Sequence, residues 1–112
     1  MKPTRIVYIA GPFSSDPVMG TRAAILTMAQ LRSVGLGAIC PHLSLLAEIV
    51  APLGYQSWID LDLALLERCD AVLVLPGKSP GAELEEEHAR GLGMPVYRDL
   101  GQCICEMSGA PN

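Results

Sequence analysis

Short apolar runs rich in β-branched residues alternate along the chain with longer segments in which apolar residues recur at helical spacing. The runs predict strands, of which the first three end at Gly or Pro, over residues 5–10, 36–40, 71–75 and 95–97. The longer segments predict helices over residues 21–34, 42–51, 56–69, 79–92 and 100–107. A polar loop is predicted over residues 13–20.

Strands that alternate with helices predict the α/β fold class, with a doubly wound parallel sheet of four to five strands and helices on both faces. In such a sheet, ligands bind beyond the carboxyl ends of the strands. The loops after Ala10, Cys40 and Leu75 are therefore the expected position of a site. A chain of 112 residues has room for one core, so we expect a single domain, 1–112.

Two acidic residues fall on helix faces that are otherwise apolar. Glu85 lies within the apolar stripe of its predicted helix, together with Ala82, Ala89 and Leu92. Asp62 lies in the middle of the buried side of the preceding helix, together with Trp58, Ile59, Leu63, Leu65 and Leu66. A buried, unpaired carboxylate costs several kcal/mol or shifts its pKa instead. Both acids are therefore candidate functional groups.

Structural roles stay open for these residues. Asp62 can cap a neighbouring loop by accepting backbone N–H bonds, and Glu85 can reach the helix edge or pair with one of the two arginines of helix 21–34. His88, beside the apolar stripe, is more typical of a packed histidine than of a catalytic one. His42, directly after the second strand and its proline, either belongs to the loop structure or lines the site.

The start of one predicted helix and the end of the first predicted strand have residue types that suit a ligand. Ser79 and Pro80 are favoured at the N-cap and first position of a helix, and the same helix start, with Gly81, can bind a small anion or hydroxyl through its N–H groups. Gly11 and Pro12 form a turn after the first strand, where the absent side chain of Gly11 allows close approach of a ligand. Neither a G-x-G-x-x-G fingerprint nor a Walker A motif is present.

Composition narrows the class of partner and the compartment. Eight Lys and Arg against twelve Asp and Glu give a net charge of −4, and the scattered basic residues predict neither a nucleic-acid polymer nor an anionic membrane surface as partner. No run reaches the roughly 18 apolar residues of a membrane span. The four cysteines form no C-x-x-C pair and no His cluster accompanies them, so we expect neither a metal nor a cofactor. With half of its residues apolar, the chain needs no disulfides, which predicts a reducing cytoplasm as its compartment.

Four short motifs stand in order along the chain: VYIAGP at 7–12, Asp62 ahead of CDAV at 69–72, SPGAELE at 79–85, and GMPV at 93–96. Their order and spacing, from Ile6 to Val96, resemble the nucleoside 2-deoxyribosyltransferase superfamily. That superfamily includes deoxynucleoside 5′-monophosphate N-glycosidases and short bacterial and phage proteins with a YIAGP start. The resemblance implies a flavodoxin-like sheet and one nucleoside deoxyribosyltransferase-like domain.

The resemblance also implies roles for individual residues. Glu85 matches the carboxylate that attacks the anomeric carbon of the sugar, Asp62 matches the aspartate that orients or protonates the base, and Tyr8 matches a tyrosine near the sugar. Together with the loops expected at the carboxyl ends, it gives these substrate-binding candidates: Gly11, Pro12, Phe13, Ser14, Ser79, Gly81 and His42.

Three positions bear on the substrate within the superfamily. Ser79 stands where the monophosphate hydrolases have Ser and typical transferases have Asp, which favours a 5′-phosphorylated substrate. Ser14 and Ser15 occupy a region in which the hydrolases have an Arg, and Glu87 replaces a glycine usually found two residues after the nucleophile.

The sequence thus predicts cleavage or transfer at the N-glycosidic bond of a nucleoside or nucleoside 5′-monophosphate, by an N-glycosidase or a 2′-deoxyribosyltransferase. A non-catalytic nucleotide-binding or sensor module on the same fold is the second hypothesis. A purely structural α/β domain, with both acids in caps or ion pairs, is the third. The resemblance further implies a homodimer or higher homo-oligomer, because family sites are completed by a neighbouring subunit.

Overall fold

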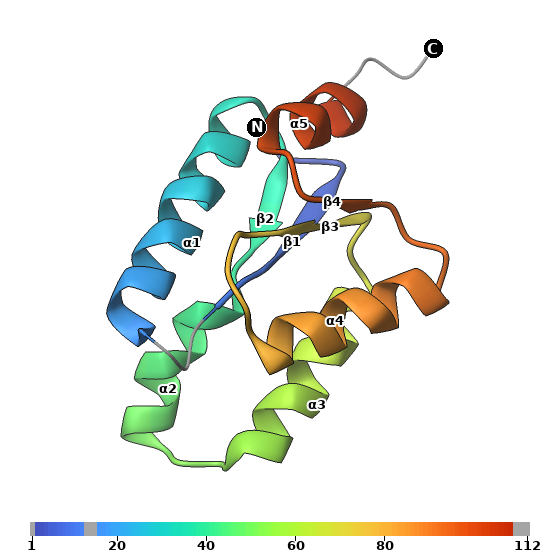
Figure 1. Cartoon of the computed structure of the whole chain (residues 1–112). Helices are drawn as coiled ribbons and strands as arrows, with labels where there is room; N and C mark the ends of the chain where they lie inside the picture. Colours follow the sequence, from blue (N-terminus) through green and yellow to red (C-terminus); the bar gives the residue numbers. More distant parts are fainter. Residues whose placement is uncertain (1, 13–15, 109–112) are drawn as a thin grey trace.

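A parallel β-sheet lies at the centre of the molecule (Figure 1) in the computed structural model, which describes residues 2–12 and 16–108. Within these residues the strands are β1 (Ile6–Ala10), β2 (Gly37–Ile39), β3 (Ala71–Val74) and β4 (Val96–Tyr97). They lie in the order β2-β1-β3-β4, and each neighbouring pair is parallel. The predicted α/β class with a parallel sheet is confirmed.

The connections that leave the sheet centre run in opposite directions. From β1 the chain crosses to β2 at one edge and then returns to β3 on the other side of β1, where Tyr8 lies opposite Val72. This arrangement places the topological switch point between β1 and β3. A ligand is therefore expected beyond Ala10 and Val74, the last residues of these two strands.

Four helices cover the faces of the sheet (Figure 1): α1 (Pro17–Ser33) and α5 (Leu100–Ser108) on one side, α3 (Tyr55–Leu66) and α4 (Pro80–Gly91) on the other. A short 3₁₀ helix η1 (Pro41–Leu43) and α2 (Ser44–Val50) follow β2, and α2 lies beyond the end of the sheet. Because side chains alternate along a strand, Val7 and Ile9 of β1 face one core and Tyr8 and Ala10 face the other. The first core contains residues of α1 and α5, and the second contains residues of α3 and α4.

The first helix begins earlier than predicted. Residues 17–20 belong to α1 and not to the predicted polar loop. The Asp16 carboxylate accepts a hydrogen bond from Met19 N at 3.1 Å, and Pro17 occupies the first helical position. A capping aspartate followed by proline is a strong helix start, so the helix begins directly after Asp16 and continues through Gly20.

Other differences concern the ends of elements. The predicted helix 42–51 is divided into η1 and α2, and the predicted helix 56–69 ends at Leu66. Leu92, predicted on the buried side of α4, is 52% exposed because the helix ends at Gly91 and Leu92 forms its C-cap. Among the described helices, none has both the length and the apolar character that crossing a membrane requires.

Candidate active site

A cavity of about 380 Å³ opens beyond the carboxyl ends of β1 and β3. Sites for small molecules typically have volumes of roughly 300–1,000 Å³. All three loops that the sequence pointed to contribute to its wall, together with α2, α3 and α4. The lining residues are Gly11, Pro41, His42, Ser44, Glu48, Tyr55, Trp58, Ile59, Asp62, Ser79, Pro80, Gly81, Ala82 and Glu85.

Glu85 lies on the inner face of α4 and is only 5% exposed. The hydroxyl of Tyr8, fully buried on β1, donates a hydrogen bond to Glu85 Oε2. The arginines of α1 do not pair with this carboxylate: Arg32 Nη1 donates instead to Leu36 O at 2.8 Å, and Arg22 is exposed on α1, which packs against the opposite core. Glu85 is therefore held in the cavity wall by a neutral donor.

Asp62 reaches the same cavity from α3. Its neighbours on the buried side of that helix are Ile59 and Leu66, and the residue is 9% exposed. Within the described part of the chain, no N–H or O–H group donates a hydrogen bond to its carboxylate, so a loop-capping role has no partner there. Its exposed fraction faces the cavity, which leaves the carboxyl group available to a ligand.

The three buried groups influence one another electrostatically. Burial raises the pKa of Asp62 to about 6. Burial also raises the pKa of Glu85 to about 7, with a further contribution from the Asp62 charge, while the hydrogen bond from Tyr8 acts in the opposite direction. Burial and the neighbouring Glu85 raise the pKa of Tyr8 far above its ordinary value. The tyrosine therefore stays protonated and donates, whereas both carboxyl groups can change protonation state near neutral pH.

His42 lines the cavity and also supports the loop after β1. Its Nε2 lies 3.1 Å from Pro12 O, and its Nδ1 lies 3.5 Å from Cys40 Sγ. A carbonyl oxygen can only accept, so Nε2 carries a proton in this contact. Burial lowers the pKa of His42, which favours the neutral ring, with Nδ1 accepting from the thiol. Both alternatives from the sequence thus apply, because His42 lines the cavity while it holds Pro12 in place.

The remaining predicted binding residues fall into two groups. Gly11, Ser79 and Gly81 lie in the cavity wall, whereas Phe13 and Ser14 lie outside the described residues. Ser79 is the N-cap of α4 and accepts from Ala82 N at 3.2 Å.

Gly11 has a packing role in addition to its place in the wall. A Cβ there would lie 3.1 Å from the side chain of Leu75, so any larger residue at this position would have to displace Leu75 slightly. Pro12 is half-buried next to it.

One residue that the sequence singled out, His88, lies outside the cavity wall. Its Nε2 lies 2.7 Å from Glu67 Oε2, a partly exposed contact between α4 and the C-cap of α3. Among the described residues, no three His, Cys, Asp or Glu side chains are close enough to hold a metal ion together.

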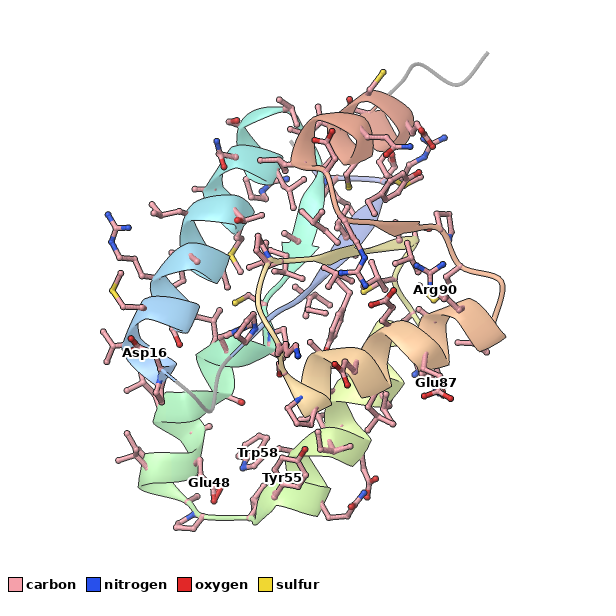
Figure 2. All side chains as sticks on the ribbon, viewed as in Figure 1. Asp16, Glu48, Tyr55, Trp58, Glu87 and Arg90 are labelled. Atoms are coloured by element: carbon pink, nitrogen blue, oxygen red, sulfur yellow. The ribbon has the colours of Figure 1, made fainter. Side chains whose placement is uncertain are left out.

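The sequence did not point to the wall formed by α2 and the start of α3. Figure 2 shows Glu48, Trp58 and Tyr55 grouped between these helices. Trp58 Nε1 donates to Glu48 Oε2, and all three residues line the cavity. One signal was available: Trp58 precedes Asp62 by four residues, so both must lie on the same face of α3.

The sequence profile of the family described as "Domain of unknown function (DUF4406)" matches residues 5–98. The chain belongs to this family. No curated protein matches the DUF4406 chain at a significant level.

Solved structures with a similar fold include "2-desoxiribosyltransferase from Leishmania mexicana". The alignment has 20% sequence identity and a TM-score of 0.64, and it covers 82% of the DUF4406 chain and 61% of that structure. The chain thus spans about 61% of the length of this relative. At this level of identity the likeness concerns the fold, and the 2-deoxyribosyltransferase-like, flavodoxin-like fold that the sequence resemblance implied is confirmed.

Proposed function

We propose that this protein is an enzyme that cleaves or transfers at the N-glycosidic bond of a nucleoside or nucleoside 5′-monophosphate. The observation that carries the proposal is the convergence of two buried carboxyl groups, Glu85 and Asp62, on one cavity of small-molecule size. The likeness of the fold to a 2-deoxyribosyltransferase supports the general class of chemistry.

In this proposal Glu85 acts on the sugar. Loss of the base produces positive charge at the anomeric carbon, and a carboxylate beneath that carbon can stabilise the charge or bond to it covalently. The hydrogen bond from Tyr8 fixes the direction of the Glu85 carboxylate without adding a positive charge that would weaken its nucleophilicity. Tyr8 is therefore a positioning residue as well as a neighbour of the proposed sugar site.

Asp62 acts on the base. The leaving base needs a proton or a hydrogen bond, and a carboxyl group with a pKa of about 6 retains a proton in a useful fraction of molecules near neutral pH. Its carboxyl group has no donor within the described residues, which leaves it available to the base. Water then releases the sugar in a hydrolase, and a second base does so in a transferase.

The charge of the described wall supports a neutral nucleoside over its 5′-monophosphate. The wall contains three acidic residues and, among the described residues, no Lys or Arg. At the start of α4, Pro80 lacks an N–H group, and the amides of Ala82 and Glu83 donate to Ser79. Only Gly81 N is left to meet a phosphate there, so the described residues do not support the 5′-phosphorylated substrate that Ser79 favoured.

The test is release of free base from a panel of nucleosides and 5′-monophosphates, followed by chromatography. We expect base release by the wild-type protein, and we expect Glu85→Gln to lose at least roughly a thousandfold in rate, as when nucleophiles are removed from other enzymes. Glu87→Gln, on the exposed side of α4, is the matched control and is expected to retain activity. Turnover by Glu85→Gln at the wild-type rate would remove Glu85 from the mechanism.

The same assay separates hydrolysis from transfer and catalysis from binding. Addition of a second base accelerates consumption of the nucleoside by a transferase, whereas it leaves the rate of a hydrolase unchanged. Glu87 in place of the family glycine is the feature that favours the alternative, a nucleotide-binding module. That alternative predicts a nucleoside-dependent rise in Tm with no released base after long incubation.

The homodimer implied by the resemblance is part of the proposal. Apolar side chains of α2 and the following turn are strongly exposed, among them Leu46 (73%), Ile49 (67%) and Val50 (84%). Exposed apolar surface of this kind marks interaction sites, and it lies on the helix that forms one wall of the cavity. Light scattering of the purified protein at micromolar concentration measures the oligomeric state, and a monomer would contradict this part of the proposal.

The cytoplasm remains the predicted compartment; Cys40, Cys69, Cys103 and Cys105 are all free thiols.

A further inference from the structure

The part of the cavity that the proposed chemistry leaves unused is largely apolar. Along α3 the exposed fraction falls from Tyr55 (70%) through the half-buried Trp58 to Asp62 (9%). Pro80, Gly81 and Ala82 of α4 line the same cavity. A Cβ placed on Gly81 would lie 4.0 Å from Tyr55 Oη, so the tyrosine reaches towards the start of α4. An aromatic wall therefore borders the two acids.

The indole of Trp58 is fixed by a hydrogen bond of its own. Its Nε1 donates to the Glu48 carboxylate, which also accepts from Leu53 N at 3.1 Å and from Gly54 N at 3.3 Å. Leu53 and Gly54 directly precede α3, so Glu48 holds the turn that leads from α2 into α3. One carboxylate thus joins the end of α2, the start of α3 and the indole ring.

We propose that Trp58 is the platform on which the base of the substrate stacks, and that Glu48 is the positioning residue that sets the orientation of the indole. The inference rests on the proposed function for the nature of the ligand, a nucleoside. It adds the residue that recognises the base and the residue that holds it.

The spacing along α3 supports this arrangement. Residues four apart on a helix have Cβ atoms about 5–6 Å apart on one face, so a planar ring lying against Trp58 presents its edge to Asp62. Its glycosidic bond then extends towards α4 and Glu85, both of which line the same cavity. Stacking and protonation of the base are thereby assigned to successive turns of one helix.

The hydrogen bond to Glu48 also determines what Trp58 can discriminate. Its N–H group, the only polar group of the side chain, is already used. Trp58 therefore contributes through its π surface alone, which stacks with every base. We expect it to strengthen binding of purines and pyrimidines alike and to leave the choice between them to other residues.

The chain contains a single tryptophan, so its intrinsic fluorescence reports on Trp58 directly. The experiment titrates the Glu85→Gln protein, which does not consume the ligand, with adenine, cytosine, the corresponding deoxynucleosides and free deoxyribose. Saturable quenching by the bases and nucleosides, without quenching by deoxyribose, is the expected result. Equal quenching by deoxyribose, or no quenching by any base, would overturn the proposal.

Variants of Trp58 keep the test independent of fluorescence. By calorimetry on the same Glu85→Gln background, we expect Trp58→Ala to weaken nucleoside binding by roughly 5- to 150-fold, the range found for loss of one base–aromatic stack. Trp58→Phe retains a ring and is expected to bind within a few-fold of the parent protein. Leu61→Ala, at an exposed position of the same helix, is the matched control. Unchanged binding by Trp58→Ala would contradict the assignment.

Glu48 is tested by a readout that follows the indole itself. Glu48→Ala is expected to lower the fluorescence anisotropy of Trp58 and to raise KM more than it changes kcat, whereas Glu48→Gln, whose amide oxygen still accepts, restores both. Anisotropy that is identical in Glu48→Ala and the wild type would exclude the positioning role. Bases that quench Trp58 while no nucleoside is cleaved would contradict only the proposed function. Base release that is unaffected by Trp58→Ala would contradict only this inference.

Discussion

A carboxyl group on the buried face of a helix is costly in its charged form, and the two in this protein have different surroundings. Glu85 has one hydrogen-bond donor, the Tyr8 hydroxyl, and Asp62 has none among the described residues. Neither has a basic partner within the described part of the chain. The protein therefore retains both acids in a state whose charge is set by pH, which has consequences for activity and for stability.

Activity is expected to depend on pH through the pair of acids. The proposed mechanism needs Glu85 ionised and Asp62 protonated, and because the two groups interact, the apparent values of about 7 and about 6 belong to the pair. The profile of kcat/KM is therefore expected to be a narrow bell with its maximum between pH 6 and 7. Asp62→Asn should lose the alkaline limb, and an unchanged profile in this variant would contradict the role of Asp62 as the acid.

Stability is expected to fall as the pH rises through the same range. Both acids have higher pKa values in the folded protein than their ordinary values of 3.8 and 4.5, so the folded state binds more protons. The stabilisation is complete below about pH 4 and is lost as the pH rises through 6 to 7, by on the order of 3 kcal/mol for each group at about 1.36 kcal/mol per pKa unit. Urea unfolding of the wild type and Glu85→Gln at pH 5 and pH 8 measures this, and equal pH dependence in both would contradict it.

At the scale of elements, two loops at the carboxyl ends of the strands support each other. Gly77, between β3 and α4, has φ = +113°, and a Cβ there would lie 2.6 Å from Cγ of Pro12. Pro12 is in turn held by His42 from the loop after β2. The three loops that form the inner part of the cavity are thus in contact, and the position of one depends on the others.

Gly77→Ala is therefore expected to disturb the site as well as the fold. The substitution adds a strained backbone conformation and a steric clash, together about 1–3 kcal/mol of stability, and displacement of Pro12 should also weaken nucleoside binding. Thermal unfolding and calorimetry measure the two effects. Gly91→Ala, at the end of α4 where a Cβ would meet nothing within 4 Å, is the control and should be neutral or slightly stabilising. Equal stability of the two variants would contradict the packing argument.

The elements themselves could be predicted where the signal was local, and their ends could not. The burial of Glu85 and Asp62 followed from helical spacing alone, because each helix has one apolar face. The start of α1 was misplaced because the polar residues up to Asp16, with Pro17 and Gly20, look like a loop, although the Asp16 cap and Pro17 begin a helix. The role of Glu48 depends on the turn between two helices, and no local pattern specifies that contact.

At the scale of the whole molecule, the sheet decides which residues meet. The order β2-β1-β3-β4 places β1 and β3 side by side, so Tyr8 and α4 come together although they are more than seventy residues apart. Alternation of strands and helices predicted the class, but strand order depends on crossovers that the sequence pattern does not encode. Convergence of the acids is therefore a property of the complete fold.

The most direct test of the central claim is a crystal structure of Glu85→Gln with an uncleaved nucleoside. The account predicts that the anomeric carbon lies about 3–3.5 Å from the side chain at position 85, that the base lies within hydrogen-bond distance of Asp62, and that the ring lies against Trp58. A nucleoside bound elsewhere, or one whose sugar faces away from position 85, would contradict it.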